Sequence, residues 1–408
     1  MKPGFLASLG LLLAGAILGV PVAGVLGVVG LTLEVVHWIW ATRGLQGVRY
    51  ARRLAAPRVA WGEEVALEVD VWNRKRLPLA WLRADDAASP GLLVRDRPTV
   101  ETEDYGPTLR NTWTLAPYER VVRHLHVTAD RRGVFTLGPV DIAVGDLFAR
   151  PAATTQLDPI DTLLVWPRTV PAPPMIRPER WGDLDRARRG LVEDPSRFAG
   201  IRPYSPGDPI RRVHPRISER LGRPMTKRFE PSRERDVLIA LDLQTETGRS
   251  WELSVDDDAV EELFVVAGSV ARSLAAQHAS FGLTAAGYSG LPRRFADVGV
   301  AQSAGQVERV LDLLARLSPT PSAPFETLLA RIERRVSNGT TVLVISARGS
   351  GAFVRPLRRL ARAGFGISIL AVGPDAAANA AAARGAGFTA RAAILDGPWP
   401  TATRLALT

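Results

Sequence analysis

Basic side chains are concentrated between residues 200 and 235, where ten Lys or Arg stand against four Asp or Glu, a local net charge of +6. Guanidinium groups bind carboxylates and phosphates through paired hydrogen bonds, so this segment could dock an acidic partner or an anion. The interpretation that we favour is a salt-bridged structural clasp between the sandwich and the carboxyl-terminal domain. Asp208 could pair with Arg211 or Arg212 and order the loop. Nucleic acid is disfavoured, because the arginines are not interleaved with aromatic side chains that stack on bases.

Catalytic chemistry has little support in the rest of the chain. There is no cysteine, which excludes thiolate metal sites and catalytic thiols. The 408 residues include five histidines but no G-x-S-x-G or H-E-x-x-H pattern, and no phosphate-binding glycine motif follows a strand. His124 and His126 share one strand face, yet no third metal ligand accompanies them, which favours a polar surface. We therefore expect a protein that is not an enzyme.

The amino-terminal region is predicted to enter a membrane. Residues 3 to 33 carry no charge and the apolar stretch extends to Trp40, which exceeds the apolar core of a signal peptide. The length suits one tilted helix or a hairpin of two, and the break at Gly19-Val20-Pro21 favours the hairpin. Basic residues flank both ends, so both ends and the large soluble part are expected in the cytoplasm, beside the cell membrane.

Two ionisable side chains lie close to the end of this apolar stretch. Glu34 and His37 are three residues apart and so share a helix face. Ionisable groups inside a membrane are functional candidates. The neighbouring Trp38 and Trp40 are typical of the membrane interface, which favours a position at headgroup level.

Residues 48–166 are predicted to form a β-sandwich. Val65, Leu67, Val69 and Val71 alternate with polar residues, as in a strand with one buried face. Further short strands are predicted, including 134–137 and 140–144, which Gly138-Pro139 would separate. Five prolines between 167 and 178 then predict an extended, semi-rigid linker over residues 167–199.

Residues 236–408 are predicted to form a doubly wound α/β domain, because apolar runs alternate with helical patterns. Asp256 to Asp258 precede a helix and are predicted to cap its amino terminus. The expected strands and helices are 236–243, 259–277, 281–286, 307–317, 340–346, 354–363, 366–372 and 376–384.

The basic segment resembles the signature of the domain of unknown function 58 family, in which an Arg-x-Tyr-x-Pro-Gly-Asp pattern precedes a von Willebrand factor A-like domain. Pro215 and Glu219 depart from that signature, where Trp and Ala are expected. The resemblance implies a non-enzymatic adaptor that works with a MoxR-type AAA+ ATPase in the assembly or maturation of other proteins. The matching positions, which are candidates for docking, are Arg202, Tyr204, Pro206, Gly207, Asp208, Arg211, His214, Ser218 and Arg220.

The resemblance also implies where a metal could bind. Von Willebrand A-like domains often hold Mg²⁺ through a D-x-S-x-S motif after the first strand, since hard cations prefer carboxylate and hydroxyl oxygens. Here Asp242 is kept, but Gln244 and Glu246 replace the two serines. We therefore expect a degenerate site, in which Asp242 either contacts an arginine of a partner or only caps a loop. Mg²⁺-dependent ligand binding remains the alternative function.

Overall fold

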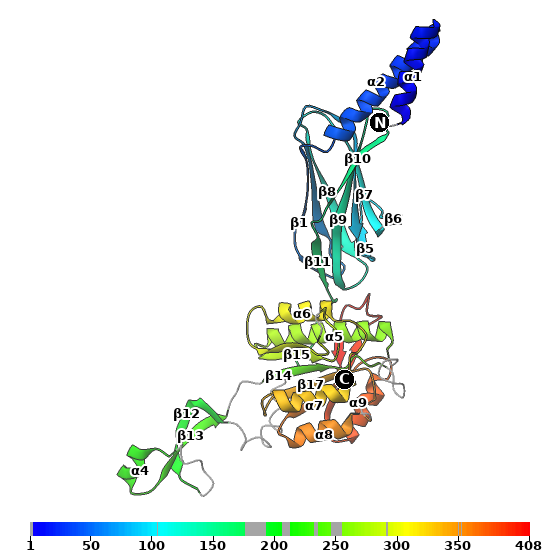
Figure 1. Ribbon diagram of the computed structural model, residues 1–408. Helices are drawn as coiled ribbons and strands as arrows, with labels where there is room; N and C mark the ends of the chain where they lie inside the picture. Colours follow the sequence, from blue (N-terminus) through cyan, green and yellow to red (C-terminus); the bar gives the residue numbers. More distant parts are fainter. Residues whose placement is uncertain are drawn as a thin grey trace. The chain divides into compact units, whose positions relative to one another are not determined.

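The computed structural model describes residues 3–103, 105–175, 193–205, 213–231, 236–245, 255–290, 293–349, 351 and 353–408 (Figure 1). The chain divides into two compact units, Met1–Trp166 and Pro167–Thr408. The first unit holds an apolar helical hairpin and two β-sheets. The second holds a mixed α/β sheet and a separate two-stranded hairpin with one short helix.

The apolar segment forms two packed helices, α1 (Pro3–Leu18) and α2 (Pro21–Arg43), as the proline predicted. The chain turns at Gly19, whose positive φ of 66° suits glycine. The helices approach closely, because a Cβ atom added to Gly15 would lie 2.3 Å from the backbone nitrogen of Gly24. Helix α2 is long and apolar enough to cross a membrane.

Two sheets of the first unit enclose a shared apolar core. One has the strand order β1-β3-β8-β5, and the other has the order β2-β11-β9-β4-β7-β6 with β10 paired to β9. The strands are β1 (Val48–Leu54), β2 (Arg58–Ala60), β3 (Val65–Asn73), β4 (Leu79–Ala88), β5 (Leu92–Val94), β6 (Val100–Thr102), β7 (Gly106–Leu115), β8 (Arg120–Ala129), β9 (Gly133–Gly145), β10 (Pro151–Leu157) and β11 (Asp161–Trp166).

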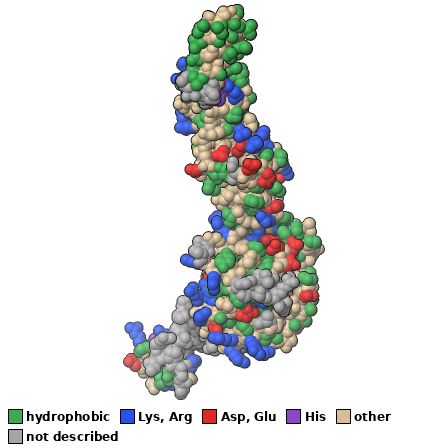
Figure 2. All heavy atoms as spheres, turned by 45° about the vertical axis from the view of Figure 1, so that its right-hand side comes forward, with side chains coloured by type: hydrophobic (Ala, Val, Ile, Leu, Met, Phe, Trp, Pro, Cys, Tyr) green, Lys and Arg blue, Asp and Glu red, His purple; other side chains and the backbone are tan. Residues whose placement is uncertain are grey.

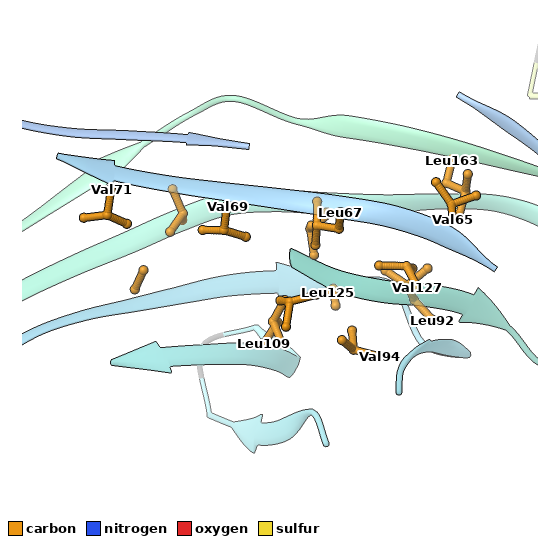
Figure 3. Close-up of a cluster of buried hydrophobic side chains, with 14 of the residues drawn as sticks. Val65, Leu67, Val69, Val71, Leu92, Val94, Leu109, Leu125, Val127 and Leu163 are labelled. Atoms are coloured by element: carbon orange, nitrogen blue, oxygen red, sulfur yellow. The ribbon is translucent and has the colours of Figure 1, made fainter. Parts of the chain in front are cut away.

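The alternation predicted for β3 is confirmed. Val65, Leu67, Val69 and Val71 are all buried and lie in a row on one face of the sheet, beside Leu125 and Val127 of the neighbouring strand β8 (Figure 3). Every second residue of β3 points to the same face, so one strand supplies a continuous apolar stripe. This pattern is what identifies a sandwich-like pair of sheets from sequence.

The predicted separation of strands 134–137 and 140–144 is wrong. Strand β9 runs unbroken through Gly138-Pro139, pairing with β11 before the proline and with β10 after it. Pro139 has no N–H to donate, and the register with β4 shifts at this point, between Asp86 and Ala88. A proline can therefore sit within a long strand where its pairing changes.

The extended, semi-rigid linker predicted over 167–199 is described only at its two ends, and its first residues belong to the second unit. Residues 167–175 pack against the rest of that unit: Val170 N donates to Ser269 Oγ at 2.9 Å, and Pro171 O accepts from Leu405 N at 3.0 Å. Buried apolar side chains at Val170 and Met175 explain why this proline-rich stretch docks. The predicted end at 199 lies inside a strand, β12 (Glu193–Pro203).

Strand β12 pairs with β13 (Met225–Pro231), and the short helix α4 (Pro215–Leu221) precedes β13. The main sheet of the second unit has the order β16-β15-β14-β17-β18-β19-β20, in which β15, β14, β17, β18 and β19 are parallel. Its strands are β14 (Val237–Leu241), β15 (Phe281–Ala285), β16 (Ala296–Ala301), β17 (Thr341–Ser346), β18 (Gly366–Ala371), β19 (Thr389–Leu395) and β20 (Leu405–Leu407).

Helices lie on both faces of this sheet (Figure 1). One face packs on α7, α8 and α9 through a shared apolar cluster, and α5 and α6 cover the other. The predicted cap is confirmed, since Asp256 accepts hydrogen bonds from the backbone of Asp258 and Ala259. The helices are α5 (Asp257–Ala276), α6 (Gln306–Arg316), α7 (Phe325–Arg335), α8 (Val354–Arg362) and α9 (Ala376–Gly385).

Candidate functional site

The carboxyl ends of β14 and β17 bring together two buried charges of the second unit, Asp242 and Arg348. The two strands are neighbours, and the helices that follow them, α5 and α8, cover opposite faces of the sheet. In open parallel sheets, ligands bind outside the carboxyl ends of the strands at such a reversal of order. Asp242 follows β14 directly, and Arg348 comes two residues after β17.

Asp242 is fully buried, and both of its carboxylate oxygens are hydrogen-bonded. Oδ1 accepts from the backbone N–H of Gln244 at 3.1 Å, as in a loop cap. Oδ2 accepts from Ser346 Oγ at 2.8 Å and from Arg348 Nε at 2.9 Å. The carboxylate is thus neutralised by a guanidinium of its own chain.

Arg348 is itself almost enclosed, with 7% of its side chain exposed. Its guanidinium lies 5.7 Å from the ring centre of Phe353, and Nη2 lies 3.8 Å from Glu326 Oε1. Nη2 is buried and has no hydrogen-bond partner among the described residues. A buried N–H of a charged group without an acceptor is costly, so Arg348 has unused capacity to bind a carboxylate oxygen.

Burial sets the titration of Asp242. It raises the pKa of this carboxyl to about 6, although the charge of Arg348 and the hydrogen bonds from Arg348, Ser346 and Gln244 act to lower it. The folded carboxyl therefore binds its proton more tightly than the unfolded one, whose pKa is about 4. The contribution of Asp242 to the free energy of unfolding is largest below that unfolded value and is lost as the pH rises to about 6.

Replacement of Asp242 by Asn should therefore remove this part of the pH dependence. We expect the stability difference between wild type and Asp242→Asn to shift in favour of the variant as the pH rises through this window. Urea titrations at several pH values, followed by helical circular dichroism, measure it. Parallel pH curves for the two proteins would contradict the assigned titration.

The arrangement does not fit a magnesium ion. A cation at Asp242 would have to displace the Arg348 guanidinium, and the second motif residue, Gln244, accepts a hydrogen bond from Phe325 N at 3.0 Å. No group of three His, Cys, Asp or Glu suited to a metal occurs within the described ranges. Glu246, the third position of the expected motif, lies outside them. The arginine expected from a partner is supplied by this chain instead.

Part of the basic motif has a local structural role. The backbone of His214 bonds Met225 O at 2.8 Å, and Ser218 Oγ donates to His214 O at 2.9 Å and accepts from Met225 N at 2.9 Å. These bonds hold α4 against β13. Arg202 Nη1 donates to Pro203 O at 3.2 Å.

The structure gives fewer contacts for the other residues of the basic motif. The Tyr204 N–H donates to Pro224 O at 2.9 Å, and Arg220 is exposed in the last turn of α4. The expected docking residues Pro206, Gly207, Asp208 and Arg211 lie outside the described residues, so the predicted pairing of Asp208 stays a prediction.

The motif that located Asp242 does not include Arg348, which follows Ala347 just beyond β17. The available signal was a basic residue just beyond a buried strand whose neighbour ends in a buried aspartate. Two such strand ends at one sheet edge predict an ion pair.

A family match covers the segment that joins the basic motif to this sheet edge. The family described as protein of unknown function DUF58 matches residues 200–373. The uncharacterized protein YeaD of Bacillus subtilis is 23% identical over 246 residues, which are 60% of this chain. The match spans only 57% of that relative's length.

Similar solved structures are distant. A CARDB domain from Pyrococcus furiosus, solved with di-metal ions, is 12% identical and matches 29% of this chain and 91% of its own, with a TM-score of 0.20. A cohesin module from Clostridium perfringens is 11% identical and matches 28% of this chain and 96% of its own, with a TM-score of 0.19. Similarity at this level carries no argument about the present chain.

Proposed function

We propose that this chain is a membrane-anchored, non-enzymatic adaptor whose second unit binds a partner protein without a metal ion. The observation that carries the proposal is the Asp242–Arg348 pair, which places a cation of the chain itself where related domains would hold Mg²⁺. The order of the parallel strands and the helices on both faces support a von Willebrand A-like, doubly wound α/β unit. Helix α2 supports anchoring in the cell membrane.

The partner expected from the family resemblance is a MoxR-type AAA+ ATPase, with the soluble part in the cytoplasm. The full chain in lipid nanodiscs and the purified ATPase of the same organism test this by biolayer interferometry. We expect binding without nucleotide to be equal in Mg²⁺ and in EDTA. No binding by the folded chain would overturn the partner, and binding lost in EDTA would favour the alternative, a Mg²⁺-dependent ligand site.

A charge reversal beside Arg348 tests whether the ATPase binds at this edge of the sheet. Glu326 is 36% exposed beside Arg348, at the start of α7. Glu326→Lys should strengthen ATPase binding at least tenfold, because it removes the carboxylate 3.8 Å from Arg348 Nη2 and adds a second cation toward the partner's carboxylate. Glu308→Lys is the control, since it makes the same charge change at an exposed glutamate in the first turn of α6, and it should bind as wild type. Equal affinities for the two variants would move the contact away from this edge.

Magnesium should also leave the stability of the second unit unchanged. Only a ligand that binds the folded state raises the melting temperature, and Arg348 occupies the cation position beside Asp242. We expect no shift on adding millimolar Mg²⁺ to the EDTA-treated chain, measured by scanning calorimetry. A shift that Asp242→Ala abolishes would establish the metal site instead.

A further inference from the structure

The loop between β9 and β10 holds two apolar side chains out from the sandwich. Leu147 is 57% exposed and Phe148 is 54% exposed. Hydrogen bonds within the loop hold it as an ordered turn, since Asp146 Oδ1 accepts from Phe148 N at 2.9 Å and from Arg150 N at 3.0 Å. Ala149 has a positive φ of 60°. Two adjacent exposed apolar side chains on an ordered turn are a candidate contact for an apolar surface.

Polar contacts fix this loop against helix α2. Arg150 Nη2 donates to Leu33 O at 2.7 Å, and Nη1 lies 3.6 Å from Glu34 Oε1. The buried Asp146 carboxylate bonds Arg150 Nε at 2.9 Å and lies 3.1 Å from His37 Nδ1. The loop therefore lies level with residues 33–37, well before the end of α2 at residue 43.

The distance along α2 from the hairpin turn to residue 33 is shorter than the hydrocarbon core is thick, so the loop would not lie in water. From Pro21 to Leu33, α2 rises only about 20 Å, whereas the hydrocarbon core of a bilayer is about 30 Å thick. Helix α1 starts at the same level, because a Cβ on Gly4 would lie 2.8 Å from Glu34 Oε1. If the turn reaches the far edge of the hydrocarbon, the loop lies about 10 Å inside the near edge, which is deeper than the headgroup level predicted from sequence for Glu34 and His37.

We propose that the loop formed by residues 146–150 enters the near leaflet and that Leu147 and Phe148 contact lipid acyl chains. This inference rests on the proposed membrane anchoring. At that depth Arg150 pairs with Asp146 and lies 3.6 Å from Glu34, and such pairing is how ionisable groups inside a membrane are usually accommodated. The surface of the helical hairpin is largely apolar, as its green colour in Figure 2 shows, and the loop is hydrogen-bonded to this hairpin at Leu33.

Spin labels test the depth of the loop, and the chain has no cysteine of its own to interfere. Phe148→Cys in the full chain carries a nitroxide, in vesicles of phosphatidylcholine and phosphatidylglycerol. Its accessibility to oxygen and to a water-soluble nickel chelate is compared with two references of similar exposure. Val28→Cys on α2 is 53% exposed, and Leu93→Cys on β5 is 49% exposed.

The Phe148 label should behave like the Val28 label, with oxygen favoured over the chelate several-fold, while the Leu93 label favours the chelate. Leu147→Cys repeats the measurement should the Phe148 variant fold poorly. A lipid-like Val28 label with water-like labels at both loop positions overturns the loop contact and leaves the anchor standing. A water-like label at Val28 overturns the anchor and the loop contact together.

Discussion

Replacement of Arg348 by Ala should destabilise the second unit by about 3–5 kcal/mol. The change leaves Asp242 fully buried with a charge that only Ser346 and one backbone N–H still stabilise. Urea denaturation of the full chain in detergent, followed by helical circular dichroism, gives the free energy of unfolding. Arg355→Ala is the control, because Arg355 is exposed on α8; its effect should stay within about 0.5 kcal/mol.

A double variant shows whether the stability lost in Arg348→Ala comes from the missing ion pair or from the unpaired buried charge of Asp242. Asp242→Asn combined with Arg348→Met removes both charges and keeps an apolar side chain of similar length near Phe353. Replacing a buried ion pair by uncharged groups is often neutral, so most of the lost stability should return. If Arg348→Ala alone were as stable as wild type, Asp242 would not be held by the guanidinium, and the metal-free interpretation of the site would lose its basis.

Replacement of Arg52 by Ala should destabilise the sandwich by about 3–5 kcal/mol. Arg52 is 1% exposed, and its Nη1 lies 2.7 Å from Oδ1 of the fully buried Asp86. Its Nε lies 3.1 Å from Asp161 Oδ2, and Nη2 donates to Pro159 O at 2.6 Å. One side chain thus ties β1 and β4 to the segment that enters β11.

Hydrogen exchange read by mass spectrometry assigns this effect to the right unit. Peptides from β3 and β8 should lose protection in Arg52→Ala, and peptides from β14 and β17 should not change. Arg53→Ala, one residue along the same strand and exposed, should leave both sets as in wild type. Equal protection in the Arg52 and Arg53 variants would mean that the ion pair with Asp86 contributes little.

The apolar pattern predicted the strands that are buried on one or both faces. β3 alternates with period two, and β14 is buried at every position, so both are visible in the sequence. β19 was not predicted, because three of the seven residues Thr389–Leu395 are alanine and the buried positions follow no strict period. Helix α7 was missed as well, although its buried residues Phe325, Leu328, Leu329 and Ile332 have helical spacing.

The candidate site was only half predictable. Asp242 was predictable because it directly follows a buried strand and matches the first position of the metal-site motif. Its partner Arg348 lies 106 residues further along the chain, and only the parallel pairing of β14 with β17 brings the two together. The contacts of Glu34 and His37 with Arg150 and Asp146 were invisible for the same reason, since they depend on where the loop after β9 returns.

The short connection between α2 and β1 has a consequence for how this chain would meet other molecules. Only residues 44–47 separate the helix from the strand, and Trp40 Nε1 donates to Pro78 O at 3.2 Å. For a chain anchored as proposed, the sandwich cannot rotate freely on a flexible linker, and it keeps one orientation relative to the bilayer plane. A partner diffusing in the same membrane then always meets the same side of it. The two proteins then meet by diffusion in two dimensions, and their rotation is already restricted. Binding therefore costs less translational and rotational entropy.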